Sequence, residues 1–123
     1  MKLFAFVKRK DGMTREEFLD HWRNRHGPLI RDTPGLGDRT IRYVQHAAHP
    51  NDRSGFDGVA EQQFASWDDF VAMIGGPEGE LMRADEANFL DPAAIRVVFT
   101  DDSVTMVDRT GVDGTALDRT AEA

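Results

Sequence analysis

The sequence contains no cysteine among its 123 residues. Disulfides, thiolate catalysis and cysteine-based zinc or iron-sulfur sites are therefore excluded. No apolar run approaches the roughly 18 residues that a membrane span needs, so we expect no membrane partner. Basic residues are the minority, 15 Lys and Arg against 22 Asp and Glu, with a net charge of -7. This balance argues against a nucleic-acid partner, because phosphate binding needs a basic face.

The length and the remaining composition fit one globular domain with a modest core. Hydrophobic residues make up 40% of the chain and charged residues 30%, which is ordinary for such a domain. The opening MKLFAFVKRKDG has a short apolar run but no cleavage-site pattern, and it predicts a strand rather than a signal peptide. We expect a cytoplasmic protein.

A helix that begins after Thr14 carries an aromatic ridge. Phe18, Trp22 and His26 stand four apart, so on a helix they share one stripe that must face the core. Gly27-Pro28 predicts a break just past His26. The imidazole is therefore expected at the point where the helix breaks. It is either a structural residue that bonds a freed carbonyl or part of a pocket.

Apolar periodicity and turn residues predict six elements in order. The strands are expected at 3–7, 39–48, 59–65 and 95–100, the last with a possible extension to 107, and the helices at 14–33, broken after His26, and at 66–89, interrupted at Gly75-Gly76-Pro77. The order is that of a ferredoxin-like βαββαβ domain, a four-stranded antiparallel sheet with helices on one face. The bare face must be covered, and a homodimer is the simplest cover. We place the domain at 1–107 and expect the polar tail, 108–123, to be disordered or to strap a partner subunit.

Polar residues on the predicted strands are candidates for a binding site. Tyr43 and Gln45 share a strand face, and if it faces the helices they can donate to a ligand oxygen near His26. If it faces a dimer interface, they are contact residues. Glu61 is polar in a central strand, and it either orients His26 and binds substrate or forms an ion pair with Arg42 or Arg39.

Metal and nucleotide sites are not expected. His21 and His26 stand about 140° apart on an α-helix at roughly 100° per residue, which predicts that they do not bind one metal ion. His46 and His49 lack an evident third ligand. The glycine pairs lack the strand-turn-helix context of a phosphate loop. We therefore expect neither a metal nor another cofactor.

Several short motifs occur in a fixed order along the chain. They are MTREEF, HW and HGPL between Met13 and Leu29, PGL from Pro34, YVQ from Tyr43, FDGVAE from Phe56, and DE with FLD between Asp85 and Asp91. Together they resemble the EthD domain family of dimeric α+β barrel proteins, over about residues 2 to 107. The resemblance implies a ferredoxin-like protomer, a homodimer, and a small-molecule cavity between helices and sheet in each subunit.

The expected function is proton transfer on a carbonyl-bearing or aromatic small molecule, as an isomerase, dehydratase or decarboxylase. His26 would be the general acid or base and Tyr43 a second catalytic group, while Phe18, Trp22, Gln45, Glu61 and Phe89 would bind substrate. Two alternatives stay open. One is an oxidoreductase, either a cofactor-free or a haem-linked oxygenase with His26 as axial ligand. The other is a non-catalytic accessory protein of an oxygenase system.

Overall fold

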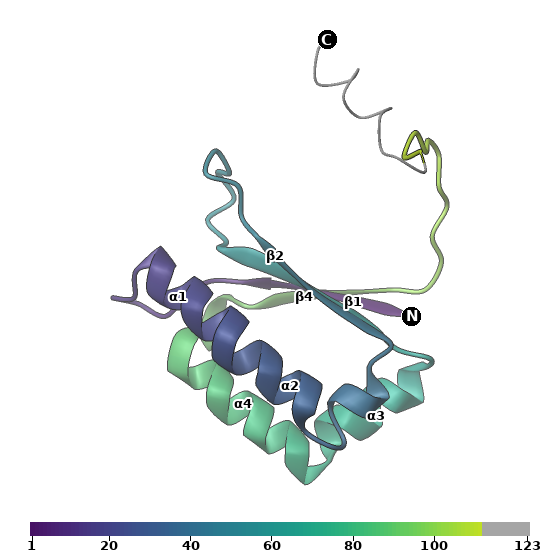
Figure 1. The fold of residues 1–123 in the computed structure, drawn as a ribbon, viewed down its shortest axis with the longest axis horizontal. Helices are drawn as coiled ribbons and strands as arrows, with labels where there is room; N and C mark the ends of the chain where they lie inside the picture. The colour runs from purple at the N-terminus through teal and green to yellow at the C-terminus, as the bar shows by residue number, and fades with distance from the viewer. Residues whose placement is uncertain (112–123) are drawn as a thin grey trace.

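The computed structural model describes residues 1–111, which form one antiparallel sheet covered by helices. The strands are β1 (Lys2–Val7), β2 (Arg42–Ala47), β3 (Gly58–Gln63) and β4 (Arg96–Thr100), and their order across the sheet is β2-β3-β1-β4. The helices pack against one side of the sheet (Figure 1). The predicted ferredoxin-like βαββαβ fold is confirmed.

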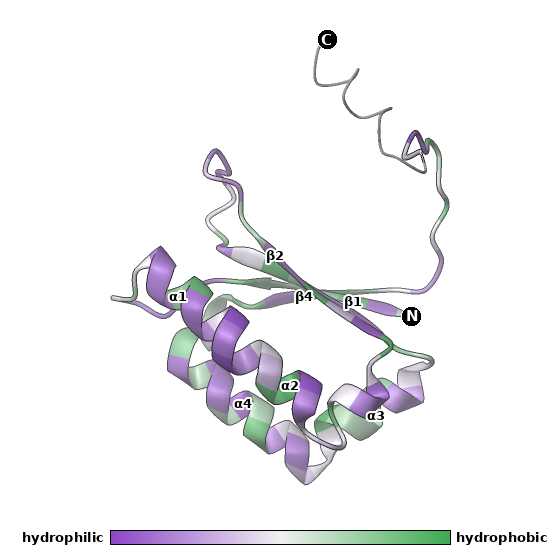
Figure 2. Cartoon of the chain, viewed as in Figure 1, coloured by the Kyte–Doolittle hydropathy of each residue, from purple (hydrophilic) through white to green (hydrophobic). Residues whose placement is uncertain are grey.

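The helical layer has two parts, which follow β1 and β3. The first contains α1 (Arg15–His21), the π-helical segment η1 (Trp22–His26) and α2 (Gly27–Asp32). The second contains α3 (Trp67–Gly75) and α4 (Pro77–Phe89); the short 3-10 turns η2 (Gly37–Arg39) and η3 (Pro92–Ala94) lead into β2 and β4. Each of the longer helices carries both hydrophobic and hydrophilic residues (Figure 2).

The predicted break at Gly27-Pro28 is wrong, because the helical run continues through it. The Gly27 N–H donates to the Trp22 carbonyl, five residues back, so the helix widens into a π-turn before the proline. Pro28 then falls in the first turn of α2, a position at which proline is common in helices. Thr14 caps the start of this run, and its side chain forms a capping box with Glu17.

The core lies between the helices and the sheet. Leu3 and Val7 of β1 face it, because side chains alternate between the two faces of a strand. The buried residues form two clusters. One contains Leu3, Ile30, Leu36, Phe64, Phe70, Met73 and Met82, and the other contains Val7, Phe18, Trp22, Phe89 and Leu90. His26 and Gln62 are the buried polar residues within 1–111.

The other face of the sheet is bare of helices. One row of paired residues crosses it, from Val44 through Glu61 and Phe4 to Val98. Its apolar members have no covering layer in a single chain.

The C-terminal part differs from the prediction. β4 ends at Thr100, since the polar run 101–103 has no strand partner, and the possible extension to 107 is not found. Residues 108–111 are exposed, while the rest of the predicted tail, 112–123, lies outside the described residues. A domain boundary at 107 stays a prediction. Within 1–111, no helix combines the length and the apolar character that a membrane crossing requires.

Candidate functional site

The aromatic ridge of the first helix lies where its spacing predicts. Phe18, Trp22 and His26 are all buried, and His26 ends the π-helical segment. π-helical turns are rare and are frequent at functional sites. The segment therefore places an imidazole inside the core, next to α4.

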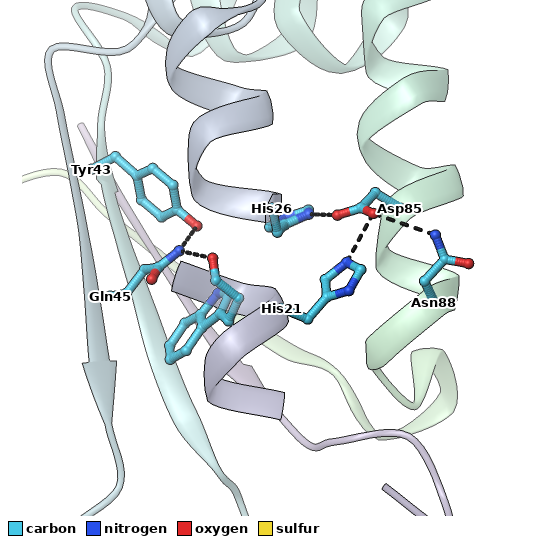
Figure 3. Close-up of polar contacts among 7 residues, drawn as sticks. His21, His26, Tyr43, Gln45, Asp85 and Asn88 are labelled. Carbon is cyan, nitrogen blue, oxygen red and sulfur yellow. Dashed lines mark hydrogen bonds and ion pairs between the residues drawn. The ribbon is translucent and has the colours of Figure 1, made fainter. Parts of the chain in front are cut away.

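His26 forms a hydrogen-bonded pair with Asp85 of α4. Its Nδ1 lies 2.8 Å from Asp85 Oδ2 (Figure 3). Burial opposes the charged form of Asp85, but hydrogen bonds from His26, His21 and Asn88 lower the pKa of this carboxyl below its usual value. An ionised carboxylate only accepts hydrogen bonds, so the His26 Nδ1 carries the proton.

The free nitrogen of His26 is thereby a base. Burial lowers the pKa of His26 below its usual 6.5, although Asp85 acts in the opposite direction. The ring is consequently neutral at neutral pH, and Nε2 keeps its lone pair. Asp85 thus fixes the tautomer and orientation of the ring, as the buried acid does in hydrolase triads.

The predicted angular separation of His21 and His26 is wrong. His21 Nε2 lies 2.9 Å from Asp85 Oδ1, so both rings converge on one carboxylate. Five residues make about one turn of a π-helix, whereas they overshoot a turn of an α-helix. The two rings are therefore close enough in direction to share one partner, contrary to the prediction. Still, residues 1–111 contain no group of three or more His, Cys, Asp or Glu arranged to hold a metal.

Phe89 holds both imidazoles in place. Its ring stacks on His21 with centroids 4.6 Å apart, and it lies 4.9 Å from His26. Its own side chain is fully buried. Phe89 does not line the cavity between helices and sheet, and its predicted contact with substrate stays a prediction.

Tyr43 and Gln45 face the helices, which was one of the two predicted arrangements. Gln45 Nε2 donates to the Trp22 carbonyl at 2.8 Å and to Tyr43 Oη at 2.9 Å (Figure 3). Gly27 permits this approach, since a Cβ there would lie 2.9 Å from Gln45 Nε2. Burial raises the pKa of Tyr43 to about 12, so its hydroxyl keeps its proton over the physiological range.

A cavity of about 220 Å³ lies between the helices and the sheet. Most of its wall is apolar, with Trp22, Ile30 and Leu90 among the lining residues. Four polar side chains also line it, and they are His26, Tyr43, Gln62 and Glu86. Convergent polar groups in an apolar pocket are the usual form of a small-molecule site.

Gln62 and Glu86 bring buried polar groups to the cavity wall. Residues 1–111 offer these groups few hydrogen-bond partners or opposite charges. Gln62 is only 7% exposed, and its Nε2 has no hydrogen-bond partner within those residues. Burial raises the pKa of Glu86 above its usual 4.5. A buried donor without a partner costs stability, so a ligand polar atom at this place would compensate it.

Asp85, Glu86 and Gln62 belong to the site but were not among the residues predicted from the sequence. Asp85 lies three after Met82 and four before Phe89, on the buried stripe of α4, and that spacing is the signal that marks it. Glu86 carries the same signal, because it lies four residues after Met82 and three before Phe89, although acids on helices are commonly solvated. The alternation along β3 does not by itself say whether Glu61 or Gln62 faces the core.

Glu61 does not lie beside His26. It is on the bare face of the sheet, where His46 Nε2 lies 3.0 Å away, Arg42 3.3 Å and Lys2 3.5 Å. The prediction that Glu61 orients His26 and binds substrate there is wrong, and the alternative ion pair with Arg42 is present. The strand alternation places Gln62 on the cavity side instead.

The fold and the buried histidine-carboxylate pair define a ferredoxin-like α+β domain with an internal pocket. The EthD domain matches residues 10–93, and the chain belongs to this family. No curated protein matches the chain.

Several solved structures share the fold. An EthD family protein of Bacillus halodurans is 21% identical, with a TM-score of 0.56 over 81% of this chain and 97% of that one. A dimeric ferredoxin-like protein of unknown function from Bacteroides fragilis is 17% identical, with a TM-score of 0.61 over 79% and 90%. A candidate antibiotic biosynthesis monooxygenase of Nitrosomonas europaea is 19% identical, with a TM-score of 0.52 over 80% and 94%. At these identities the likeness concerns the fold alone.

Proposed function

We propose that the protein is an enzyme that moves a proton on a small carbonyl compound, with His26 as the base. The observation that carries this proposal is the Asp85–His26 pair at the wall of an apolar cavity. A neutral imidazole with a fixed tautomer is the commonest general base of enzymes, and its pKa below 6.5 keeps it in the base form at neutral pH.

The other polar groups suit the charge that such a step develops. His26 Nε2 takes a proton from the carbon beside the carbonyl, and the carbonyl oxygen becomes enolate-like. Tyr43 Oη and Gln62 Nε2 are neutral donors that line the same cavity and would stabilise this oxygen. Glu86 lines the same cavity, burial raises the pKa of its carboxyl, and it would return a proton elsewhere on the molecule. Isomerisation, dehydration and decarboxylation all use these parts.

The cavity volume limits the ligand. About 220 Å³ is below the roughly 300–1,000 Å³ of pockets that take drug-sized ligands. Phe18 and Phe89 pack behind Trp22 and the histidines rather than leaving space. We therefore expect a compact substrate, and the cavity as formed has no room for a haem. Trp22 forms part of the cavity wall, and Gln45 holds the Tyr43 hydroxyl through a hydrogen bond.

We also propose that the chain forms a homodimer through the bare face of its sheet. The row from Val44 to Val98 leaves apolar side chains in water in a single chain. The Bacteroides fragilis protein of the same fold is dimeric. The pocket lies on the other side of the sheet, so pairing would leave it in each subunit.

Proton abstraction can be measured without knowing the natural substrate. The probe is cyclopentanone in deuterated buffer, with loss of its α-proton signal followed by NMR. We expect the wild-type protein to accelerate exchange, and His26→Gln to lose about 10²- to 10⁴-fold of that acceleration, the range of general-base contributions. His46→Gln is the matched control, since His46 lies on the bare face and pairs with Glu61.

A second variant, Tyr43→Phe, keeps the test informative if His26→Gln does not fold. It removes one hydroxyl and keeps the ring. We expect it to retain the fold by circular dichroism and to slow exchange by about 10-fold or more. Equal exchange by wild type and His26→Gln, in proteins that are both folded, would refute the catalytic proposal and favour a non-catalytic accessory protein.

A cofactor-free oxygenase is the second candidate. The same base would deprotonate a hydroxyaromatic compound, whose carbanion then reacts with oxygen, and the Nitrosomonas europaea protein of this fold carries a monooxygenase description. Oxygen consumption with a hydroxyaromatic compound, absent in His26→Gln, distinguishes it from the carbonyl chemistry.

A further inference from the structure

A second hollow opens beside the cavity, on the outer side of Tyr43. This outer cleft has a volume of about 380 Å³ and lies between the η1–α2 run and β2. Its lining includes Arg23, Arg31 and Arg42 and contains no acidic side chain. In a chain with a net charge of -7, a cleft lined by three guanidinium groups and no carboxylate is a local reversal of charge.

The three arginines are not equally available. Arg31 forms a two-pronged pair with Asp32, at 2.8 and 2.9 Å. Arg42 contacts Glu61 at 3.3 Å. Arg23 has no ion-pair partner among residues 1–111. Its guanidinium is therefore the cleft's available cation, and its planar donors match a carboxylate or a phosphate.

The outer cleft and the cavity share part of their walls. Ile30 and Tyr43 line both. Tyr43 therefore stands between the arginine side and the histidine side, with its hydroxyl held by Gln45. A molecule bound across this boundary would have one end on the Arg23 side and the other on the His26 side.

We propose that the substrate carries an oxyanion group, a carboxylate or a phosphate, which binds Arg23 in the outer cleft while its carbonyl enters the cavity. This inference rests on the proposed function, because it assigns the reacting end to His26. It names the substrate class as anionic carbonyl compounds. It also gives Arg23 a binding role separate from the proton transfer.

The test compares three probes that share a phenyl ketone. They are 4-oxo-4-phenylbutanoate, its methyl ester, and phenacyl phosphate. Binding to the full chain is measured by calorimetry, and the His26 ring signals are followed by NMR. We expect the acid or the phosphate to bind at least about tenfold more tightly than the ester, the magnitude of one charged hydrogen-bonded contact. Whichever anion binds more tightly identifies the oxyanion.

Arg23→Gln is the decisive variant, and Arg25→Gln is its matched control. Both arginines are exposed on the same π-helical segment, but Arg25 does not line the cleft. We expect Arg23→Gln to remove the preference for the anion and to leave ester binding unchanged, while Arg25→Gln changes neither.

The outcomes separate the two proposals. An ester that binds and shifts His26 as strongly as both anions overturns the assignment of the cleft and leaves the proposed function intact. Anion binding that Arg23→Gln and Arg25→Gln weaken equally also overturns it, because general charge then explains the effect. If no probe binds and none shifts the His26 ring signals, both the assignment of the cleft and the proposed function fail.

Discussion

At the scale of single residues, Asp85 decides which nitrogen of His26 is basic. Its two oxygens accept from both histidines and from Asn88, so it can hold both rings only as a carboxylate. An amide at this position offers one acceptor and one donor. One of the two rings would then have to change its tautomer or lose its hydrogen bond.

Asp85→Asn therefore tests the positioning role. Burial lowers the pKa of His26 while Asp85 raises it, so removing the carboxylate charge lowers it further. The wild-type exchange rate should rise with pH through a pKa below 6.5 and stay flat above it, because the base form is the active one. In Asp85→Asn we expect the midpoint at lower pH and a plateau reduced by at least about tenfold.

The control for this pH profile is Asp20→Asn, which also turns a carboxylate into an amide on the first helical run. Asp20 is exposed and bonds only Asn24 within the described residues. Its profile should match that of the wild type. A midpoint that stays in place or moves to higher pH in Asp85→Asn would contradict the assigned pair.

At the scale of elements, the sequence predicts the helices and strands well but not the π-turn. The 3.6-residue period identifies the buried stripe of Phe18, Trp22 and His26, because burial depends on local spacing. The extra residue in one turn is accompanied by a contact across the fold, the bond from Gln45 to the Trp22 carbonyl, which the local spacing does not reveal. The meeting of His21 and His26 on Asp85 follows from that turn, which is why α-helical angles failed to predict it.

Gly27→Ala tests the contact that accompanies the π-turn. The new Cβ would lie 2.9 Å from Gln45 Nε2 and 3.3 Å from the Trp22 carbonyl, so Gln45 must give up its two hydrogen bonds. Gly75→Ala is the control, because a Cβ there meets nothing within 4 Å. Both changes gain helix propensity. We therefore expect Gly27→Ala to be less stable than Gly75→Ala by about 1–2 kcal/mol in urea unfolding.

Equal stability of the two alanine variants would show that Gln45 does not restrain the turn. A fall in cyclopentanone exchange in Gly27→Ala alone would link the same contact to the Tyr43 hydroxyl, which loses its partner when Gln45 moves. Urea unfolding thus reports on the stability of the turn, and cyclopentanone exchange reports separately on the function of the site.

At the scale of the whole molecule, the order of elements and the need for a cover on the sheet were predictable, because both follow from patterns along the chain. The position of Glu61 was not, since a polar residue in a strand fits either face until its partners are known. Its place on the bare face, with Lys2, Arg42 and His46, puts a charged group among apolar neighbours such as Phe4 and Val44. That cluster would lie within the proposed dimer interface.

Val98→Glu tests the interface directly. Val98 is 51% exposed at the end of the row that crosses the bare face, and Val71 is similarly exposed, at 45%, on α3 in the other layer. A carboxylate at position 98 would be carried into the apolar contact on pairing, and moving a charge out of water costs several kcal/mol. We expect the wild type and Val71→Glu to sediment as dimers and Val98→Glu as a monomer. A monomeric wild type, or dissociation by both substitutions alike, would place the subunit contact elsewhere or remove it.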